Sequence, residues 1–178
     1  TSSGGDVVLE EADVLPSVRS DSALATRLAI EYAARAMLLL AKRAHLESED
    51  PALVASLEAS APSAKPPAAG SKAAELLKCR DDLASVRSTL RTFLDGPRRY
   101  DRAQVLLQIR ESELFEERVL LHSKLSEHES ALRVLVRDIN DLEAAEQYCL
   151  RHSSPGSTDS HDPFITLLRI YFTETDSG

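Results

Sequence analysis

The sequence predicts an all-α protein whose helices stack as in a helical-repeat array, and three observations support this prediction. Apolar residues recur every three or four positions along most of the chain, as they do on one face of a helix. Alanine and leucine dominate while aromatic residues contribute only 4%, a composition typical of closely packed helices. Three short helices are predicted between Leu114 and Cys149. Because isolated helices of about a dozen residues are marginal in water, these helices must pack on neighbours.

The chain opens with an acidic segment and a long helix. Residues 1–20 hold four carboxylates and one base among serines and glycines, which predicts a disordered lead. The pattern over residues 22–46 predicts a helix that begins at a serine N-cap, with Leu24, Leu28 and Tyr32 on its apolar stripe.

A linker separates two predicted helical parts. Pro51 opens a short helical stretch, which completes an N-terminal helical part over residues 21–59. Residues 60–72 are rich in Pro, Ala and Ser and contain too little apolar mass to pack, so they are predicted to form a flexible linker. Residues 73–178 are predicted to form the stacked repeats.

The most regular predicted helix follows this linker. Its apolar residues alternate at intervals of three and four along one seam: Leu76, Cys79, Leu83, Val86, Leu90 and Phe93. We expect it to end at residues 95–97, because Gly96 can take the left-handed C-terminal position and Pro97 cannot continue a helix. A further helix over residues 103–109 follows.

Three short helices come next, over residues 112–125, 127–139 and 141–151. Ser126 and Glu129 have the spacing of a capping box, and Asn140 with Glu143 offers a second helix start of the same kind. A loop is predicted over 152–161.

The last predicted helix begins at Asp162-Pro163, in the preferred order of capping residue and first-turn proline. It is apolar on nearly every face, whereas a terminal helix normally has a polar outer side. We expect another helical pair or a partner protein to cover it. Its candidate interface residues are Phe164, Leu167, Leu168, Ile170, Tyr171 and Phe172.

Arg98, Arg99 and Arg102 form a small basic cluster where two predicted helices meet. An acidic partner or a phosphoinositide headgroup could use such a cluster. The alternative is a solvated charged turn, in which Tyr100 packs against the following helix.

Composition excludes several classes of function. The net charge of −8 disfavours a nucleic-acid-binding surface. Two cysteines, Cys79 and Cys149, are too few for a disulfide framework, fit a reducing compartment and are predicted to be buried. No apolar run reaches the roughly 18 residues of a membrane span. Since the chain lacks an initiator Met and stops just after an apolar helix, we expect it to be part of a longer protein.

No catalytic, cofactor-binding or metal-binding residue is predicted. His128-Glu129 could open a zinc-binding H-E-x-x-H helix, but Leu132 stands where the second histidine belongs. The glycines form no phosphate-binding motif. Glutamates between residues 111 and 117, beside Arg110 and Arg118, are predicted to form a solvated salt-bridge face.

Several of these segments resemble a known family. Residues 120–125, 127–132, 141–149 and 164–171 resemble the clathrin-heavy-chain-type repeat region of the vacuolar-sorting tether subunits of the HOPS and CORVET complexes. This family includes the transforming-growth-factor-β-receptor-associated protein. Ser126 departs from the family, in which Gly is common between the helices.

The resemblance implies a right-handed α-solenoid of helical hairpins, within a longer array. It implies a non-catalytic scaffold that takes part in tethering endosomal or lysosomal (vacuolar) membranes, in the cytoplasm and peripheral to the membrane. Implied partners are other core subunits of such a complex, a Rab-type GTPase, and a growth-factor receptor or its signalling mediators. Two alternatives stay open: a nucleotide-exchange or effector module for a Rab-type GTPase, and an ordinary helical bundle.

Overall fold

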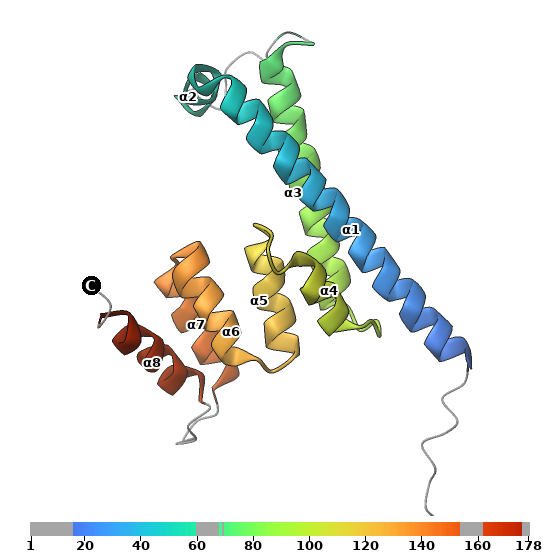
Figure 1. The fold of residues 1–178 in the computed structure, drawn as a ribbon, viewed down its shortest axis with the longest axis vertical. Helices are drawn as coiled ribbons and strands as arrows, with labels where there is room; N and C mark the ends of the chain where they lie inside the picture. The colour runs from blue at the N-terminus through green and yellow to red at the C-terminus, as the bar shows by residue number, and fades with distance from the viewer. Residues whose placement is uncertain (1–15, 60–67, 69, 154–161, 176–178) are drawn as a thin grey trace, which may run out of the picture.

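A long antiparallel helical hairpin and a group of shorter helices at its base make up the described part of the protein (Figure 1). The computed structural model describes residues 16–59, 68, 70–153 and 162–175. Within these residues all regular structure is helical, which confirms the predicted all-α class. Most of the predicted acidic lead, linker and loop lies outside the described residues.

The hairpin consists of α1 (Pro16–Glu49) and α3 (Lys72–Asp95), which contact each other more extensively than any other pair of helices. Short α2 (Pro51–Ala59) lies at its far end (Figure 1). Because α1 begins at Pro16, its first residues belong to a helix and not to the predicted disordered lead. Ser71, predicted within the linker, caps α3 by accepting a hydrogen bond from the Ala74 N–H.

The predicted apolar stripe of α1 is wrong for Leu24 and Leu28, whereas Tyr32 packs against the core as predicted. The buried residues on α1 are small, with one leucine: Thr26, Ala29, Ala33, Ala36 and Leu40. Leu24 is 62% exposed and Leu28 also reaches solvent. The small residues recur at intervals of three and four, which matches the seam of α3 and lets the two backbones approach closely. The size of the apolar side chains therefore pointed to the wrong face.

The predicted seam of α3 is confirmed, since all six of its residues are buried. The helix ends at Asp95 as predicted, but by a different mechanism. Gly96 has φ −61° and ψ 167°, an extended conformation and not the left-handed one. A residue before proline is pushed out of the helical region, so Pro97 accounts for the end of the helix.

Helices α4 (Arg102–Ile109) and α5 (Phe115–Lys124) pack at the base of the hairpin. Asp101 caps α4 by accepting from the Gln104 N–H at 2.9 Å. Tyr100 is buried as predicted, and its hydroxyl donates to the Leu94 carbonyl at 2.8 Å. These contacts anchor one hydrophobic core, which joins α1, α3, α4 and α5.

Two cap predictions need correction at the turns around α6 (His128–Arg133) and the π-helical turn η1 (Val134–Ile139). Ser126 does not cap α6; it has φ 59°, in the left-handed region that favours glycine. Asn140 is also left-handed and ends η1. Asp141 is the residue that caps α7 (Leu142–His152), with its side chain accepting from the Ala144 N–H.

The last described helix, α8 (Pro163–Thr175), begins as predicted. The Asp162 carboxylate accepts from the Phe164 N–H at 2.8 Å and from the Ser153 hydroxyl at 3.1 Å. A second hydrophobic core joins α6, η1, α7 and α8, with Val119 of α5 packed against it.

Consecutive short helices therefore stack on one another: α5 contacts α6, and α8 contacts both α6 and α7. The stacking agrees with an α-solenoid. The clathrin-type repeat arrangement and its right-handed sense stay predictions.

Candidate interaction surfaces

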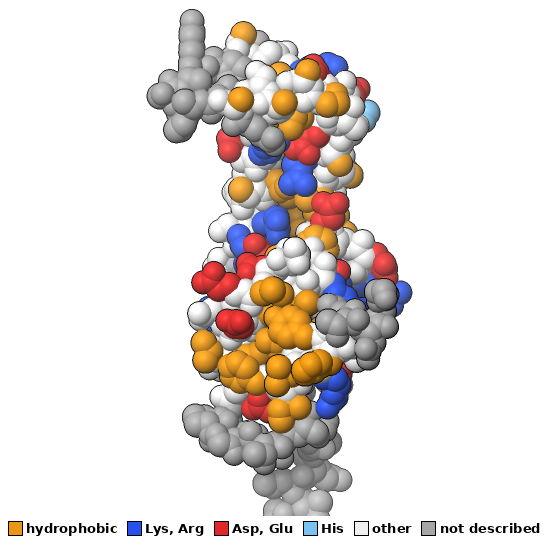
Figure 2. Space-filling model, turned by 90° about the vertical axis from the view of Figure 1, so that its left-hand side faces the viewer, with side chains coloured by type: hydrophobic (Ala, Val, Ile, Leu, Met, Phe, Trp, Pro, Cys, Tyr) orange, Lys and Arg blue, Asp and Glu red, His pale blue; other side chains and the backbone are white. Residues whose placement is uncertain are grey.

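An apolar stripe lies on the outer side of α8. Phe164, Leu168 and Phe172 are one helical turn apart, and all three are exposed, as is the adjacent Ile165. We call these four residues the α8 surface. Figure 2 views the molecule from the side on which α8 lies, and it shows hydrophobic side chains gathered there with few charges among them. Exposed apolar patches are typical of interaction sites, so the α8 surface is a candidate for one.

The α8 surface differs from the interface predicted from the sequence. Leu167 and Ile170 are buried against the neighbouring helices and belong to the second core. Tyr171 is partly buried in the same core. Helical geometry explains this difference. Leu167 and Ile170 are three residues apart, so they lie on the same face of α8, and this is the face that the neighbouring helices cover. Ile165 is the surface residue that the sequence interpretation missed.

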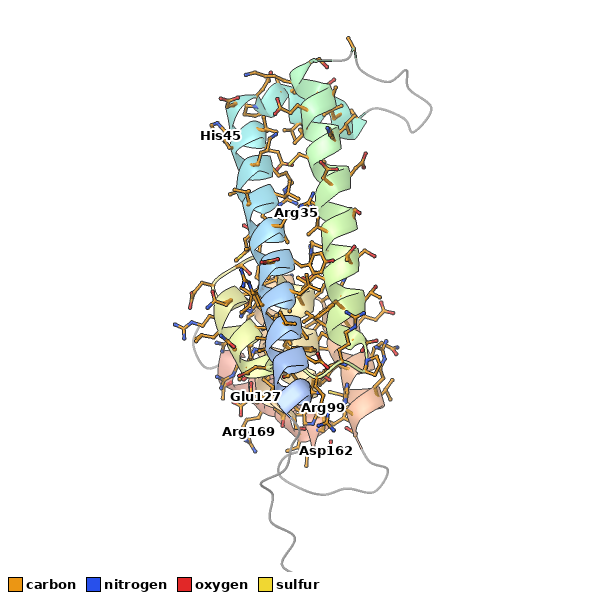
Figure 3. All side chains as sticks on the ribbon, turned by 90° about the vertical axis from the view of Figure 1, so that its right-hand side faces the viewer. Arg35, His45, Arg99, Glu127, Asp162 and Arg169 are labelled. Atoms are coloured by element: carbon orange, nitrogen blue, oxygen red, sulfur yellow. The ribbon has the colours of Figure 1, made fainter. Side chains whose placement is uncertain are left out.

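The three arginines of the predicted basic cluster are all exposed but make different contacts, and their action as one patch stays a prediction. Arg102 donates to the Lys124 carbonyl at 3.0 Å, at the C-terminal end of α5. Arg98 lies over the Phe93 ring, with its guanidinium carbon 5.2 Å from the ring centroid. Arg99 is exposed and lies at the end of the hairpin where α1 begins (Figure 3). Arg98 and Arg99 line one hollow, and Arg102 contacts the C-terminal end of α5, where a positive charge is favourable.

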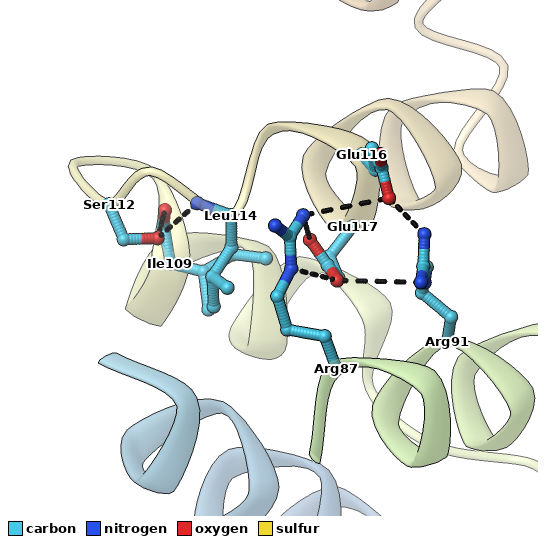
Figure 4. Close-up of polar contacts among 7 residues, drawn as sticks. All are labelled: Arg87, Arg91, Ile109, Ser112, Leu114, Glu116 and Glu117. Carbon is cyan, nitrogen blue, oxygen red and sulfur yellow. Dashed lines mark hydrogen bonds and ion pairs between the residues drawn. The ribbon is translucent and has the colours of Figure 1, made fainter. Parts of the chain in front are cut away.

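A buried ion pair joins α3 to α5 (Figure 4). Arg87 donates to both carboxylate oxygens of Glu117, at 3.0 and 2.9 Å. Glu117 is fully buried, so the prediction that it belongs to a solvated face is wrong. The hydrogen bonds to Glu117 raise the pKa of Arg87 above its ordinary value. Arg91 adds a pair with exposed Glu116, which stays on the predicted charged face.

Four side chains that could carry chemistry meet between α5, α6 and α7. The Ser123 hydroxyl lies 3.2 Å from Nε2 of His152, and His128 Nδ1 lies 2.8 Å from the Tyr148 hydroxyl. Burial, followed by the charges of His128 and Arg151, lowers the pKa of His152. In the described part of the chain no carboxylate pairs with His152, so the serine–histidine pair lacks the third group that orients a catalytic base.

The two cysteines, whose side chains could also react, lie in the interior of the protein. Both cysteines are buried and free, as predicted. Burial, with the charges of Asp162 and Glu146, raises the pKa of the Cys149 thiol to about 11, which disfavours the reactive thiolate.

Among the residues that the structure describes, no group of three or more His, Cys, Asp or Glu side chains is placed to hold a metal ion. Over the same residues, no helix is both long and apolar enough to cross a membrane.

The described residues thus define an all-helical module with an exposed apolar stripe. The chain is 32% identical over 92 residues, 52% of its length, to the human (Homo sapiens) Vam6/Vps39-like protein. It is 42% identical over 94 residues, 51% of its length, to the transforming growth factor-beta receptor-associated protein 1 homolog of Danio rerio. It is 33% identical over 86 residues, 48% of its length, to vacuolar sorting protein 3 of Arabidopsis thaliana.

These similarities confirm the resemblance to the vacuolar-sorting tether subunits over about half of the chain. The matched segments span 10%, 11% and 8% of the three relatives, so the chain covers about a tenth of their length. No family model matches the sequence, and no solved structure matches it.

Proposed function

We propose that this chain is a non-catalytic scaffold segment of a HOPS- or CORVET-type tethering subunit, which takes part in vesicle-mediated transport. The similarity to several vacuolar-sorting proteins supports the trafficking role. The single observation that carries the scaffold role is the α8 surface, an exposed apolar stripe on a stacked helical frame. Stacked helices hold binding surfaces at fixed separations, which is what a tether requires.

The α8 surface is proposed to bind an apolar helix of another core subunit. Phe164 and Phe172 present aromatic rings at two ends of the stripe, and aromatic side chains are enriched at the centres of protein interfaces. Leu168 lies between them and completes a stripe that a helix can cover by ridges-into-grooves packing. The right-handed solenoid arrangement belongs to the same proposal, with α5 to α8 as two of its hairpins.

Membrane association is proposed to be indirect. The chain would lie on the cytoplasmic side of endosomal or lysosomal (vacuolar) membranes and be held there by the complex. A Rab-type GTPase, and a growth-factor receptor or its signalling mediators, are further proposed partners. The names of two relatives support the last of these, because both are described as transforming growth factor-beta receptor-associated proteins.

Capture by purified core subunits of the complex tests this proposal. We expect the wild-type chain to be retained and the double variant Leu168→Ser/Phe172→Ser to lose at least about tenfold in affinity, since two apolar side chains leave the interface. Leu38→Ser is the matched control, because Leu38 is 71% and Phe172 69% exposed on different helices. Equal retention of the double variant and the wild type would contradict the proposed surface.

The alternative of a nucleotide-exchange module has its own measurement. A fluorescent nucleotide bound to a purified Rab-type GTPase reports release directly. Release at the same rate with and without the chain is expected of a scaffold. Acceleration that depends on the chain's concentration would overturn the non-catalytic assignment.

A further inference from the structure

The first turns of α1 carry an exposed pair of leucines that the packing of the hairpin does not use. Leu24 and Leu28 lie one turn apart, while the alanine face of α1 packs on α3. The two leucines line a mostly apolar hollow of about 430 Å³. Arg98 and Arg99, from the connection between α3 and α4, form its opposite wall. This groove brings together segments that are far apart in the sequence.

The walls of this groove are fixed by buried contacts. On the α1 side, the Thr26 hydroxyl is buried and accepts from the Asp101 N–H at 2.8 Å. On the connection side, Tyr100 donates to the Leu94 carbonyl, and its ring packs on Phe93 at a centroid distance of 6.0 Å. A groove with walls held in this way is preorganised, so little ordering opposes the entry of a ligand.

Two arginines and one carboxylate, Asp21, line the groove, so its net charge is opposite in sign to that of the protein as a whole. The chain has a net charge of −8, yet none of the carboxylates among the described residues forms an ion pair with Arg98 or Arg99. The guanidinium of Arg99 is exposed, and that of Arg98 lies on the Phe93 ring with its donors accessible at the surface. Arginine presents several N–H donors in a plane, which suits carboxylate recognition.

We propose that this groove binds an acidic, leucine-bearing helical segment of a partner protein. Leucines of the partner would enter the hollow beside Leu24 and Leu28, and a carboxylate on its flank would pair with Arg99. Apolar contact provides the affinity and the ion pair fixes the orientation. The first turns of α1 and the connection between α3 and α4, which line the groove, lie on the side of the molecule away from α8 (Figure 1), so a scaffold with both surfaces would hold two partners apart.

A phosphorylated lipid headgroup fits the groove less well than a helix does. Headgroup recognition generally uses a larger group of basic side chains, whereas Arg102 is directed to the Lys124 carbonyl and leaves two arginines. The floor of the hollow is apolar and concave, a shape that accommodates side chains.

Fluorescence anisotropy with the full chain tests the assignment. The probe is a short labelled helix-forming peptide with leucines one turn apart and glutamates beside them. We expect Arg99→Glu and Leu24→Ser each to raise its Kd at least about tenfold. Arg110→Glu and Leu150→Ser are the controls, because Arg110 is exposed elsewhere and Leu150 is 64% exposed, and they should leave the Kd within about twofold.

Three results would overturn the proposal. The first is equal binding by a probe with lysines in place of the glutamates, or equal Kd values for the groove and control variants. The second is probe binding that appears only once the acids of residues 1–15 are changed to serine, because the groove of the wild-type chain would then be occupied by its own N-terminal segment. The third is binding of phosphatidylserine-containing vesicles, lost in Arg99→Glu and Leu24→Ser, without binding of the peptide.

Discussion

Removal of either partner of the Arg87–Glu117 ion pair should weaken the protein, and by unequal amounts. A buried pair broken on one side typically costs about 3–5 kcal/mol, because an uncompensated charge stays behind. In Arg87→Leu, Glu117 remains fully buried, and among the described residues its remaining ion-pair partner is Arg91, whose Nε lies 3.9 Å away. We expect this variant to lose about 3 kcal/mol of the free energy of unfolding.

The opposite change should cost less. In Glu117→Leu, Arg87 is still partly exposed and already lies 3.6 Å from Glu116, so its charge keeps solvent and a partner. A loss of about 2 kcal/mol is expected. In the double variant no charge is left unpaired, and two leucines fill the space, so its stability should lie within about 1 kcal/mol of the wild type.

Urea unfolding followed by circular dichroism measures all of these free energies. Arg110→Leu is the control, because it removes an exposed pair with Glu111 and should cost less than about 1 kcal/mol. Equal losses in the two single variants, or a double variant whose loss equals their sum, would refute the reasoning. The electrostatic contact would then not hold α5 on α3.

Three further predictions concern backbone strain, packing and protonation, all measured by urea unfolding. Ser126→Gly should add about 0.5–1 kcal/mol of stability, because it relieves φ 59°, whereas Ser130→Gly within α6 should remove about 0.5 kcal/mol. Ala33→Leu should cost about 1–3 kcal/mol by overpacking the hairpin, while exposed Ala34→Leu changes little. The lowered pKa of His152 means that the unfolded state binds its proton first, so stability falls as the pH drops below 6.5. His152→Gln should remove this pH-dependent part of the stability, and an unchanged pH dependence would contradict the stated cause. For the two serine-to-glycine variants and the two alanine-to-leucine variants, stability changes opposite in sign to those stated would contradict the cause given for each.

Local patterns in the sequence predicted much of the fold. The seam of α3 was evident because large apolar residues at intervals of three and four have a single interpretation. The start of α8 was equally clear, since Asp162 and Pro163 carry their own capping chemistry. Such features depend on residues that are neighbours in the chain.

Features that depend on a partner helix were missed. The alanine face of α1 could not be recognised, because Ala33 is buried only once α3 lies against it. Glu116 and Glu117 have the same neighbours in the sequence. Glu117 is buried and Glu116 is exposed because Arg87, 30 residues away in the sequence, packs against Glu117. The same limit applied to the surfaces, where tertiary packing buried Leu167 and left Leu24 exposed.

Hydrogen exchange of the chain alone and in complex with purified tether core subunits tests the scaffold proposal most directly. Binding through the α8 surface predicts slower exchange over residues 163–175, where the helix is covered, and no change along the far half of the α1–α3 hairpin. Unchanged exchange over α8, together with protection of another part of the chain in the same complex, would contradict it.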